Sequence, residues 1–377
     1  MESNLFKYLK EDTLVGRYIN RDMIKPLLNA LPRAFEKKVL GYSVEQRPIE
    51  AIYFGNGKHR ILMWSQMHGN EGTTTKAVFD LICSLNDPSN EKVKIDLFDT
   101  CTICIIPMLN PDGAIRHTRN NANDIDLNRD ATKLSQPESV ILRSVFEEFK
   151  PNYCFNLHDQ RSIYGFEKTK TPSVVSFLSP SASEDCGITI SRKQSMAIIA
   201  NIYSALNAEL PDQIGRYDDT YNINCVGDYF QTQEVPTILF EAGHYPKDYQ
   251  REKTRRFITQ AIWTATSSII NNELTNHNAY FEIPEHQKCY VDILVKNAKL
   301  TPSKMSRDVL FHFEEKIENG QCIFKAALYN DESNQKLFGH RDIDAGDQQI
   351  LNLKGEFIIN SGYLEGISIG NELTITF

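Results

Sequence analysis

The stretch RILMWSQMHGNEGTTTKAVFDLICSL (Arg60–Leu85) decides the fold of this 377-residue chain. Its first part, Arg60–Gln66, is an apolar run of strand length, and its last part, Thr73–Leu85, has apolar residues at helical spacing. His68 and Glu71 therefore lie at a junction between a strand and a helix, where the edge of a sheet holds short side chains rigidly. A neutral imidazole and a carboxylate three residues apart can reach one ion, and such a nitrogen and oxygen set suits catalytic zinc.

The overall charge argues against two classes of partner. The formal net charge is −8, the isoelectric point is near 5.7, and the sequence contains no long basic cluster. We therefore expect no nucleic-acid partner and no anionic membrane partner. The sequence also contains no run of 18 apolar residues, so we expect no membrane span.

The thiols and the N-terminal residues favour a reducing, cytoplasmic setting. Residues 1–20 are polar and lack the apolar core of a secretory signal, although a chain from which a leader has been removed would look the same. The eight cysteines are scattered through the chain. Cys101 and Cys104 form a C-x-x-C pattern inside a predicted buried strand, where side chains three residues apart diverge. We interpret them as structural thiols.

Strand-like apolar runs alternate with longer amphipathic stretches between about residues 38 and 273. The predicted strands are Ile49–Gly55, Arg60–Met67, Thr100–Leu109, Asn152–His158, Ser173–Leu178 and Pro236–Glu241. The predicted helices are Thr73–Leu85, Glu138–Phe149, Lys193–Leu206 and Lys247–Asn272. This order predicts the α/β class, with a parallel or mixed central β-sheet flanked by helices.

The sequence changes in character near Ile283–Pro284. From Tyr290 onward, short β-type runs are separated by Asn, Asp and Gly: YVDILVKN, DVLFHFEEKI, GQCIFKAALYN, GEFIINSGYL and GISIGNELTITF. We therefore predict two domains, an α/β domain at residues 1–283 and a small all-β domain at residues 284–377. Three histidines of the second domain lack ligand spacing and are interpreted as surface or packing residues: His286, His312 and His340.

Two further strand ends carry groups that suit a metal site. FNLHDQ places His158 at the end of a predicted strand, which makes it a candidate third ligand. TILFEAGH places Glu241 at the end of another strand, where a carboxylate can act on water beside a metal ion. In an open α/β sheet, ligands gather outside the carboxyl ends of the strands, so His68, His158 and Glu241 can share one cleft.

A polar segment supplies two arginines. LNPDG (Leu109–Gly113) is a turn signal directly after a strand. TRNNANDIDLNRD then offers Arg119, Asp126, Asn128 and Arg129. Guanidinium groups bind carboxylates in a bidentate manner and stabilise oxyanions, which suits a substrate with a free carboxylate and a polarised carbonyl. Alternatively, this segment is only a solvated loop rich in Asn and Asp. Because it occurs together with the metal-site motifs, we favour a substrate-binding role.

These motifs, in this order, resemble those of the zinc metallocarboxypeptidases of the carboxypeptidase A/B type. The likeness begins at VLGYSVEQRPIEAIYFGNG (Val39–Gly57), runs to the helix after Glu241 and covers roughly residues 38–273. MHGNE and NPDG are more similar to the regulatory carboxypeptidases and the bacterial murein-peptide amidases than to the digestive enzymes. The resemblance implies a zinc carboxypeptidase-like fold for this part of the chain.

The resemblance also implies roles at the metal. His68, Glu71 and His158 would bind one zinc ion. Glu241 would be the general base that activates water and later passes the proton to the leaving amine. Asp126 matches the family's carboxylate that orients the first histidine ligand.

The substrate-binding residues are carried over in the same way. Arg119 would polarise the scissile carbonyl, and Asn128 and Arg129 would hold the terminal carboxylate. The family also has a mobile tyrosine upstream of the base. Within RYDDTYNINCVGDYF the candidate is Tyr221, with Tyr217 in reserve, because the loop does not align without a gap.

Several positions depart from the family pattern. Asp159, Gln160 and Arg161 follow the third ligand in place of a Ser–Tyr type sequence, and Arg161 adds a positive charge that suits a second acidic group on the substrate. Gly227 falls where digestive members place the residue that sets side-chain preference, so a preference for C-terminal Lys or Arg is not supported. We interpret His244 as a residue that packs behind the site rather than as a substrate contact.

The sequence thus favours a zinc-dependent metallocarboxypeptidase, a hydrolase that cleaves an amide bond next to a free carboxylate in a peptide or small amide. Three alternatives stay open. The first is an amidase for murein peptides containing D-glutamate and diaminopimelate. The second is a deacylase of N-acyl amino acids, like aspartoacylase and succinylglutamate desuccinylase, which share HGNE, DLNR and a C-terminal β-domain. The third is a non-catalytic peptide-binding module. NPDG and the spacing of Arg119 favour the peptidase, and the sequence indicates no oligomeric state.

Overall fold

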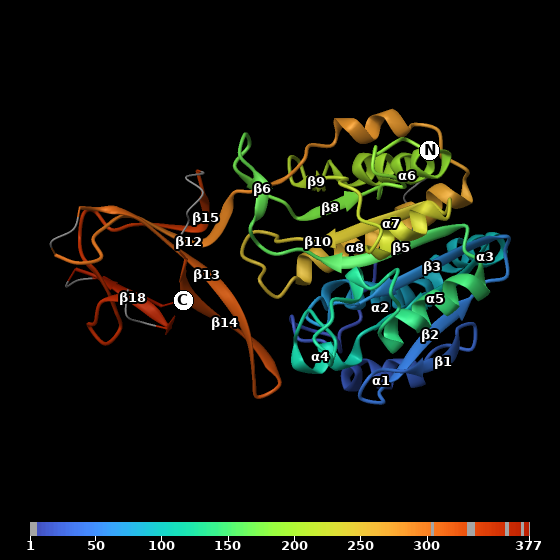
Figure 1. Ribbon diagram of the computed structural model, residues 1–377, viewed down its shortest axis with the longest axis horizontal. Helices are drawn as coiled ribbons and strands as arrows, with labels where there is room; N and C mark the ends of the chain where they lie inside the picture. Colours follow the sequence, from blue (N-terminus) through green and yellow to red (C-terminus); the bar gives the residue numbers. More distant parts are fainter. Residues whose placement is uncertain (1–5, 303–304, 330–335, 359–361, 371–372, 377) are drawn as a thin grey trace. The chain divides into compact units, whose positions relative to one another are not determined.

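A computed structural model describes residues 6–302, 305–329, 336–358, 362–370 and 373–376 (Figure 1). The chain divides into two compact units. Unit 1 comprises Met1–Gln160 and Ser173–His286, and unit 2 comprises Arg161–Pro172 and Gln287–Phe377. The segment Arg161–Pro172 thus leaves the α/β part of the chain to join the C-terminal part. Sequence analysis did not separate this segment from its neighbours, because it is short and carries no change in composition.

Unit 1 is built around an eight-stranded mixed sheet in the order β1-β2-β4-β3-β5-β10-β8-β9. Its strands are β1 (Glu36–Tyr42), β2 (Pro48–Phe54), β3 (His59–Ser65), β4 (Cys101–Ile106), β5 (Tyr153–Asp159), β8 (Val175–Leu178), β9 (Ile214–Arg216) and β10 (Thr237–Ala242). The central strands β4, β3, β5 and β10 are parallel, whereas β1–β2, β2–β4 and β10–β8 pair antiparallel. Figure 1 shows β3, β5 and β10 side by side in the middle of unit 1, and their carboxyl ends therefore meet at one edge.

Helices cover both faces of this sheet. They are α1 (Arg21–Asn29), α2 (Thr73–Leu85), α3 (Glu91–Thr100), α4 (Pro111–Arg116), α5 (Pro137–Phe149), α6 (Ile190–Leu206), α7 (Val226–Thr232) and α8 (Glu252–Ile270), with 3₁₀ turns at Pro88–Asn90, Leu127–Arg129 and His277–Glu282. Ile61 and Met63 of β3 face a core that contains residues of α2, α6 and α8. Leu62 and Trp64 face a second core with residues of α5 and α7. Because successive side chains of a strand point to opposite faces, β3 is apolar on both faces.

The predicted α/β class and the mixed central sheet are confirmed. All six predicted strands and all four predicted helices are present, and Thr73–Leu85 has the predicted bounds. The predicted buried strand with Cys101 and Cys104 is β4, and burial raises the pKa of each thiol to about 12. Sequence analysis missed several short or partly exposed elements: β1, β9, α1, α3 and α7.

The predicted start of the last helix of unit 1 is wrong. Sequence analysis began it at Lys247, but α8 begins at Glu252. Lys247 and Arg251 have left-handed backbone angles, with φ of 64° and 59°, which interrupt a right-handed helix.

The interpretation of LNPDG as a turn is also wrong, because this motif begins a helix. Pro111 occupies the first turn of α4, where its missing N–H is not needed. The side chain of Asn110 accepts a hydrogen bond of 2.8 Å from the N–H of Gly113 and so caps the helix.

The described residues of unit 2 form three β-sheets, with strand orders β11-β6-β7, β15-β12-β13-β14-β17 and β16-β18-β19. The strands are β6 (Tyr164–Phe166), β7 (Thr171–Pro172), β11 (Gln287–Lys288), β12 (Tyr290–Ala298), β13 (Arg307–Glu318), β14 (Gln321–Tyr329), β15 (Phe338–Asp344), β16 (Ile350–Asn352), β17 (Tyr363–Leu364), β18 (Gly366–Ile369) and β19 (Leu373–Thr376). The all-β character predicted for the C-terminal part is confirmed. The predicted runs GEFIINSGYL and GISIGNELTITF include residues 359–361, 371–372 and 377, which lie outside the described residues.

All three histidines interpreted as surface or packing residues contact an aromatic ring. The pairs are His286–Tyr217, His340–Tyr290 and His312–Tyr329, with ring centroids 4.2, 4.6 and 4.4 Å apart. Across the described residues, every helix is too short or too polar to traverse a bilayer.

A buried ion pair joins two helices of unit 1. Arg255 of α8 and Asp80 of α2 are fully buried, and the Arg255 Nε lies 2.8 Å from the Asp80 Oδ2. Arg255 also donates a hydrogen bond of 3.1 Å to the backbone carbonyl of Glu11, so the pair fixes the N-terminal segment as well.

We predict that Asp80→Asn lowers the free energy of unfolding of unit 1 by about 3–5 kcal/mol, because it leaves the Arg255 charge buried without its carboxylate. The control is Glu209→Gln, which breaks an exposed pair with Arg256 and should cost about 1 kcal/mol or less. Urea unfolding followed by tryptophan fluorescence measures the difference, since both tryptophans of the chain lie in unit 1. Equal midpoints for the two variants would contradict the prediction.

Candidate metal centre

Three neighbouring parallel strands bring the residues of the candidate site to one edge of the sheet. His158 lies in β5 and Glu241 in β10, and their Cα atoms are direct partners in this parallel pair. His68 follows β3, the other neighbour of β5. Glu71 lies two residues before α2, which packs over the same sheet. The structure therefore brings together four residues from three distant parts of the sequence.

The side chains of His68, Glu71 and His158 converge on one point. The His68 Nδ1 lies 2.8 Å from one oxygen of Glu71, and the His158 Nδ1 lies 2.8 Å from the other. The two Nδ1 atoms are 3.1 Å apart, and all three side chains are buried. Each residue offers one donor atom, and these donor atoms lie within 4.8 Å of one another.

This donor set fits a zinc ion. Zinc accepts imidazole nitrogen and carboxylate oxygen, and a site with three protein donors leaves one position open. Both histidines direct the same ring nitrogen toward Glu71, as expected where one cation takes all three groups. In addition, the buried Oε2 of Glu241 has no hydrogen-bond partner among the described residues.

The electrostatics of the two acids differ. Burial would raise the pKa of Glu71, but the charges of His68 and His158 hold it well below its ordinary value. Glu241 is the opposite case, because burial and the negative charge of Glu71 raise its pKa well above its ordinary value. A cation among the donors would oppose this rise, since an opposite charge favours the carboxylate form. Burial also lowers the pKa of His158, which favours the neutral ring that binds metals.

Asp126 and Arg119 support the donors from the other side. The Nε2 of His68 lies 3.1 Å from the Oδ1 of Asp126, so this carboxylate fixes the ring orientation. Arg119 donates from Nε to the Oδ2 of Asp126 at 3.1 Å, and a second guanidinium nitrogen lies 3.5 Å from the Glu71 Oε1. The Arg119 side chain is 47% exposed, so it stands between the buried donors and solvent.

Asp159, which sequence analysis noted only as a departure, holds Glu71 in place. Its carboxylate accepts hydrogen bonds from the backbone N–H groups of Thr73 and Thr74, at 3.0 and 3.3 Å, and thus caps α2. It also pairs with the buried Arg17 at 2.6 Å. The N–H of Asp159 in turn donates to the Glu71 Oε2 at 3.1 Å.

Arg251 joins β5 and β10 where the two strands end. Its guanidinium donates to the carbonyl of Ala242, directly after Glu241, at 2.9 Å and to the carbonyl of Gln160 at 3.0 Å. Arg251 is 4% exposed, so these bonds are shielded from water. No sequence motif pointed to this residue.

Asn128 and Arg129 lie in the 3₁₀ turn Leu127–Arg129, beside the start of α7. The Oδ1 of Asn128 accepts a hydrogen bond of 3.1 Å from the N–H of Val226. Arg129 is exposed and contacts the Sγ of Cys225 at 3.0 Å. The Asp126 side chain caps this turn, because it accepts a hydrogen bond from the N–H of Asn128.

The candidate mobile tyrosines, Tyr217 and Tyr221, lie in the segment between β9 and α7. Tyr221 is half-buried, and burial followed by the charge of Asp228 raises its pKa. Tyr217 packs against the ring of His286.

Two residues of α7, Gly227 and Asp228, and one residue after β10, His244, differ in their surroundings. A Cβ on Gly227 would meet the Pro180 ring at 3.0 Å, so the backbone there approaches a neighbour closely. The next residue, Asp228, is buried, and burial raises its pKa to about 6. Sequence analysis missed this acid, although it is adjacent to Gly227. His244 is buried and packs against Tyr249, with ring centroids 4.5 Å apart.

A family model described as zinc carboxypeptidase matches residues 21–209. Among curated sequences, the chain is 29% identical over 103 residues to a probable carboxypeptidase 2 of Arthroderma benhamiae and 28% identical over 175 residues to carboxypeptidase E of Caenorhabditis elegans. It is 32% identical over 96 residues to a gamma-D-glutamyl-L-diamino acid endopeptidase 1 of Lysinibacillus sphaericus. The matches cover 27%, 37% and 24% of this chain and only 19%, 37% and 24% of these relatives, so the chain spans less than half the length of each.

Solved structures share the fold at lower identity. A metallo-carboxypeptidase of Pseudomonas aeruginosa in complex with (2-guanidinoethylmercapto)succinic acid has a TM-score of 0.56 and 17% identity over 68% of this chain and 70% of that chain. A metallo-carboxypeptidase of Burkholderia cenocepacia has a TM-score of 0.52 and 19% identity over 66% of this chain and 68% of that chain. The expected zinc carboxypeptidase-like fold is therefore confirmed.

We predict that His158→Ala abolishes stoichiometric zinc retention, because it leaves two donors of the three. Elemental analysis after dialysis against a buffer without metal measures the bound zinc. The control is His277→Ala, which removes a histidine from the 3₁₀ turn at His277–Glu282 and should leave the zinc content unchanged. Full zinc occupancy in His158→Ala would rule out this ligand.

Proposed function

The chain belongs to the zinc carboxypeptidase family, and on this premise we propose that it is a metallocarboxypeptidase that hydrolyses the amide bond next to a free carboxylate in a peptide. The observation that carries the proposal is the convergence of His68, Glu71 and His158, with Glu241 opposite His158 in the neighbouring strand. An arrangement of two histidines and one acid beside a second acid suits hydrolysis assisted by a metal.

His68, Glu71 and His158 would hold the zinc ion. When bound, zinc supplies a Lewis acid that polarises the scissile carbonyl and lowers the pKa of water. Asp126 keeps the His68 ring oriented so that Nδ1 faces the site, and it does so through the 3.1 Å contact with Nε2.

Glu241 is the general base of the proposed reaction. It takes a proton from the attacking water and passes it to the leaving amine, so one carboxylate serves both proton transfers. Its buried Oε2 has no hydrogen-bond partner among the described residues, which leaves this oxygen available for a water molecule. The register of β10 against β5 supports this role, because it sets Glu241 beside a proposed ligand.

The arginines bind the two polar ends of the substrate. Arg119 stabilises the negative charge that develops on the carbonyl oxygen, and its contact with Glu71 supports a position beside the donors. Asn128 and Arg129 hold the terminal carboxylate, a group that a guanidinium binds in a bidentate manner. Tyr221 is the proposed residue that closes over the substrate.

A murein-peptide amidase is the second candidate, and the likeness to the Lysinibacillus sphaericus endopeptidase favours it over the remaining alternatives. Three substrates distinguish the carboxypeptidase, the murein-peptide amidase and the N-acyl amino acid deacylase. They are peptides with free C-termini, a murein tripeptide with a D-glutamyl–diaminopimelate bond, and N-acetyl-aspartate. We expect the free C-terminal peptides to be cleaved with the highest kcat/KM. Exclusive cleavage of the murein tripeptide would establish the second candidate instead.

We predict that Glu241→Gln retains zinc but lowers kcat roughly 10²–10⁴-fold, because the amide cannot accept the proton from water. The control is Glu234→Gln, an exposed acid in the loop before β10, which should keep normal turnover. Paired measurements of zinc content and kcat test the role. Near-normal turnover in Glu241→Gln would exclude Glu241 as the base.

We predict that Arg129→Ala lowers kcat/KM for peptides with a free C-terminus about 10–100-fold, as expected for the loss of a charged hydrogen-bond pair. C-terminally amidated peptides should be affected much less. Lys133→Ala removes an exposed charge four residues later and serves as the control. An equal loss on free and amidated peptides would show that Arg129 does not hold the carboxylate.

A further inference from the structure

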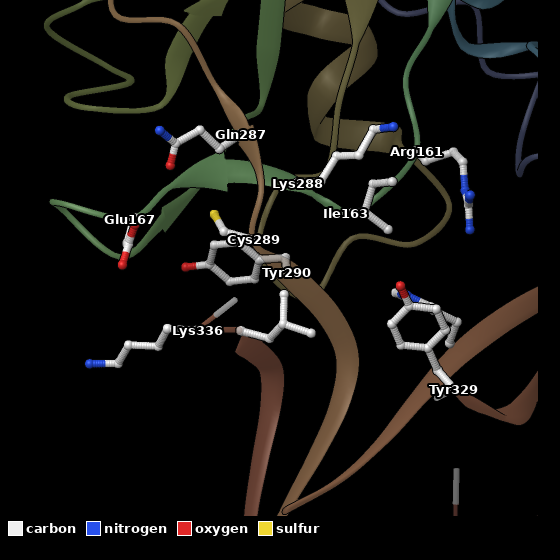
Figure 2. Close-up of a pocket in the computed structure, with 11 residues that line it drawn as sticks. Arg161, Ile163, Glu167, Gln287, Lys288, Cys289, Tyr290, Tyr329 and Lys336 are labelled. Carbon is white, nitrogen blue, oxygen red and sulfur yellow. The ribbon is translucent and has the colours of Figure 1, made fainter. Parts of the chain in front are cut away.

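Unit 2 contains a pocket of about 730 Å³ among its own residues (Figure 2). One wall comes from the Arg161–Pro172 segment and another from Gln287–Tyr290. Residues of β13 and β14 and the two residues before β15 complete the pocket. Pockets of about 300–1,000 Å³ are typical of small-molecule sites. Its lining residues belong to unit 2, whereas the residues proposed for peptide hydrolysis belong to unit 1.

Three cations line this pocket: Arg161, Lys288 and Lys336. None of the three forms an ion pair with another described residue. Glu167 is the one acid among the described lining residues. This local excess of positive charge contrasts with the net charge of −8 for the whole chain. A concave site with charges of one sign concentrates the potential that attracts a ligand of the opposite sign.

The charges are not evenly spread in the pocket. Figure 2 shows Arg161 and the Lys288 amine on one side of the Tyr290 ring, and Glu167 and Lys336 on the other. Lys336 therefore shares its end with an acid, whereas the end with Arg161 and Lys288 has no acid in its lining. The net positive charge is concentrated at the Arg161 end.

His312 also lines the pocket, and a contact with Asp292 fixes the orientation of its ring. Its Nδ1 lies 3.2 Å from the Oδ2 of Asp292, which is 2% exposed. The Asp292 carboxylate also accepts from the N–H of Phe313 at 2.8 Å and from the hydroxyl of Ser162 at 2.9 Å. Because Nδ1 of this ring faces Asp292, only Nε2 can face a ligand. When both ring nitrogens carry a proton, Nδ1 donates to the Asp292 carboxylate and Nε2 can donate to an anion.

The rest of the lining suits an apolar or aromatic body. Ile163, Leu337 and Tyr290 supply the apolar and aromatic part of the lining. Tyr329, which is 38% exposed, presents an aromatic ring next to His312. Aromatic side chains of this kind contribute contact area and one polar group each.

We propose that this pocket of unit 2 binds a ligand with an oxyanion group, a carboxylate or a phosphate, on an apolar or aromatic body. Arg161 and Lys288 hold the oxyanion, with His312 as a third donor, and the body packs against Tyr290 and Leu337. A guanidinium and an ammonium are the groups that proteins use for carboxylate and phosphate recognition. The inference does not depend on the proposed hydrolase activity.

Isothermal titration calorimetry with three matched probes tests the proposal. The probes are 3-phenylpropionate, phenyl phosphate and the neutral 3-phenylpropanamide, which share an aromatic body. The titrations use the full chain with Arg119→Ala and Arg129→Ala, so that anion binding in unit 1 does not contribute. We expect at least one acid to bind 10-fold or more tightly than the amide, and the tighter acid identifies carboxylate or phosphate as the source.

Variants at the pocket locate the binding. Arg161→Gln with Lys288→Gln should weaken the tighter acid 10-fold or more. The matched control is Lys168→Gln, which removes an exposed charge from the same Arg161–Pro172 segment but does not line the pocket, and it should change the affinity less than 2-fold. Equal affinity for acid and amide, absence of binding at millimolar probe, or an equal loss in the control would each overturn the proposal.

Discussion

The Glu71 carboxylate, held between the Nδ1 atoms of His68 and His158, is the interaction on which the rest of unit 1 depends. A buried carboxylate is costly unless charges and hydrogen bonds compensate it. Here the compensation comes from separate segments: two imidazoles, the Arg119 guanidinium and the N–H of Asp159. These segments must therefore be in register before the acid can be buried, and the sheet edge provides that register.

The surrounding scaffold acts on the strand ends rather than on the donors alone. Asp159 caps α2 and so fixes the helix that follows Glu71, while its own backbone N–H bonds the Glu71 side chain. Arg251 joins the carbonyls that follow β5 and β10. Each support is a charged group with buried backbone partners, which holds position more firmly than a solvated side chain does. The positions of His158 and Glu241 follow from this bracing.

Local sequence patterns predicted the elements that position the candidate site. Contacts between residues far apart in the sequence were not predicted. The apolar run of β3 and the helical spacing of α2 located His68 and Glu71 correctly at their junction, because both signals lie within a few residues. The capping of Thr73 by Asp159 joins residues 86 apart, and the Arg251 bond to Gln160 joins residues 91 apart, so neither leaves a local pattern. The Arg161–Pro172 segment was grouped with its sequence neighbours because its partner, β11, is remote in the chain.

The two candidate sites suit ligands of opposite charge. In unit 1, Glu71 and the nearby Glu241 are acids shielded from water, and a bound cation would reduce the repulsion between them. In unit 2, cations gather at one end of a pocket, and the buried Asp292 serves a histidine that lines it. A unit that only filled space would be more stable with apolar residues in place of a buried acid and histidine pair. The presence of that pair beside Arg161 and Lys288 therefore supports the ligand-binding role that we propose for this pocket.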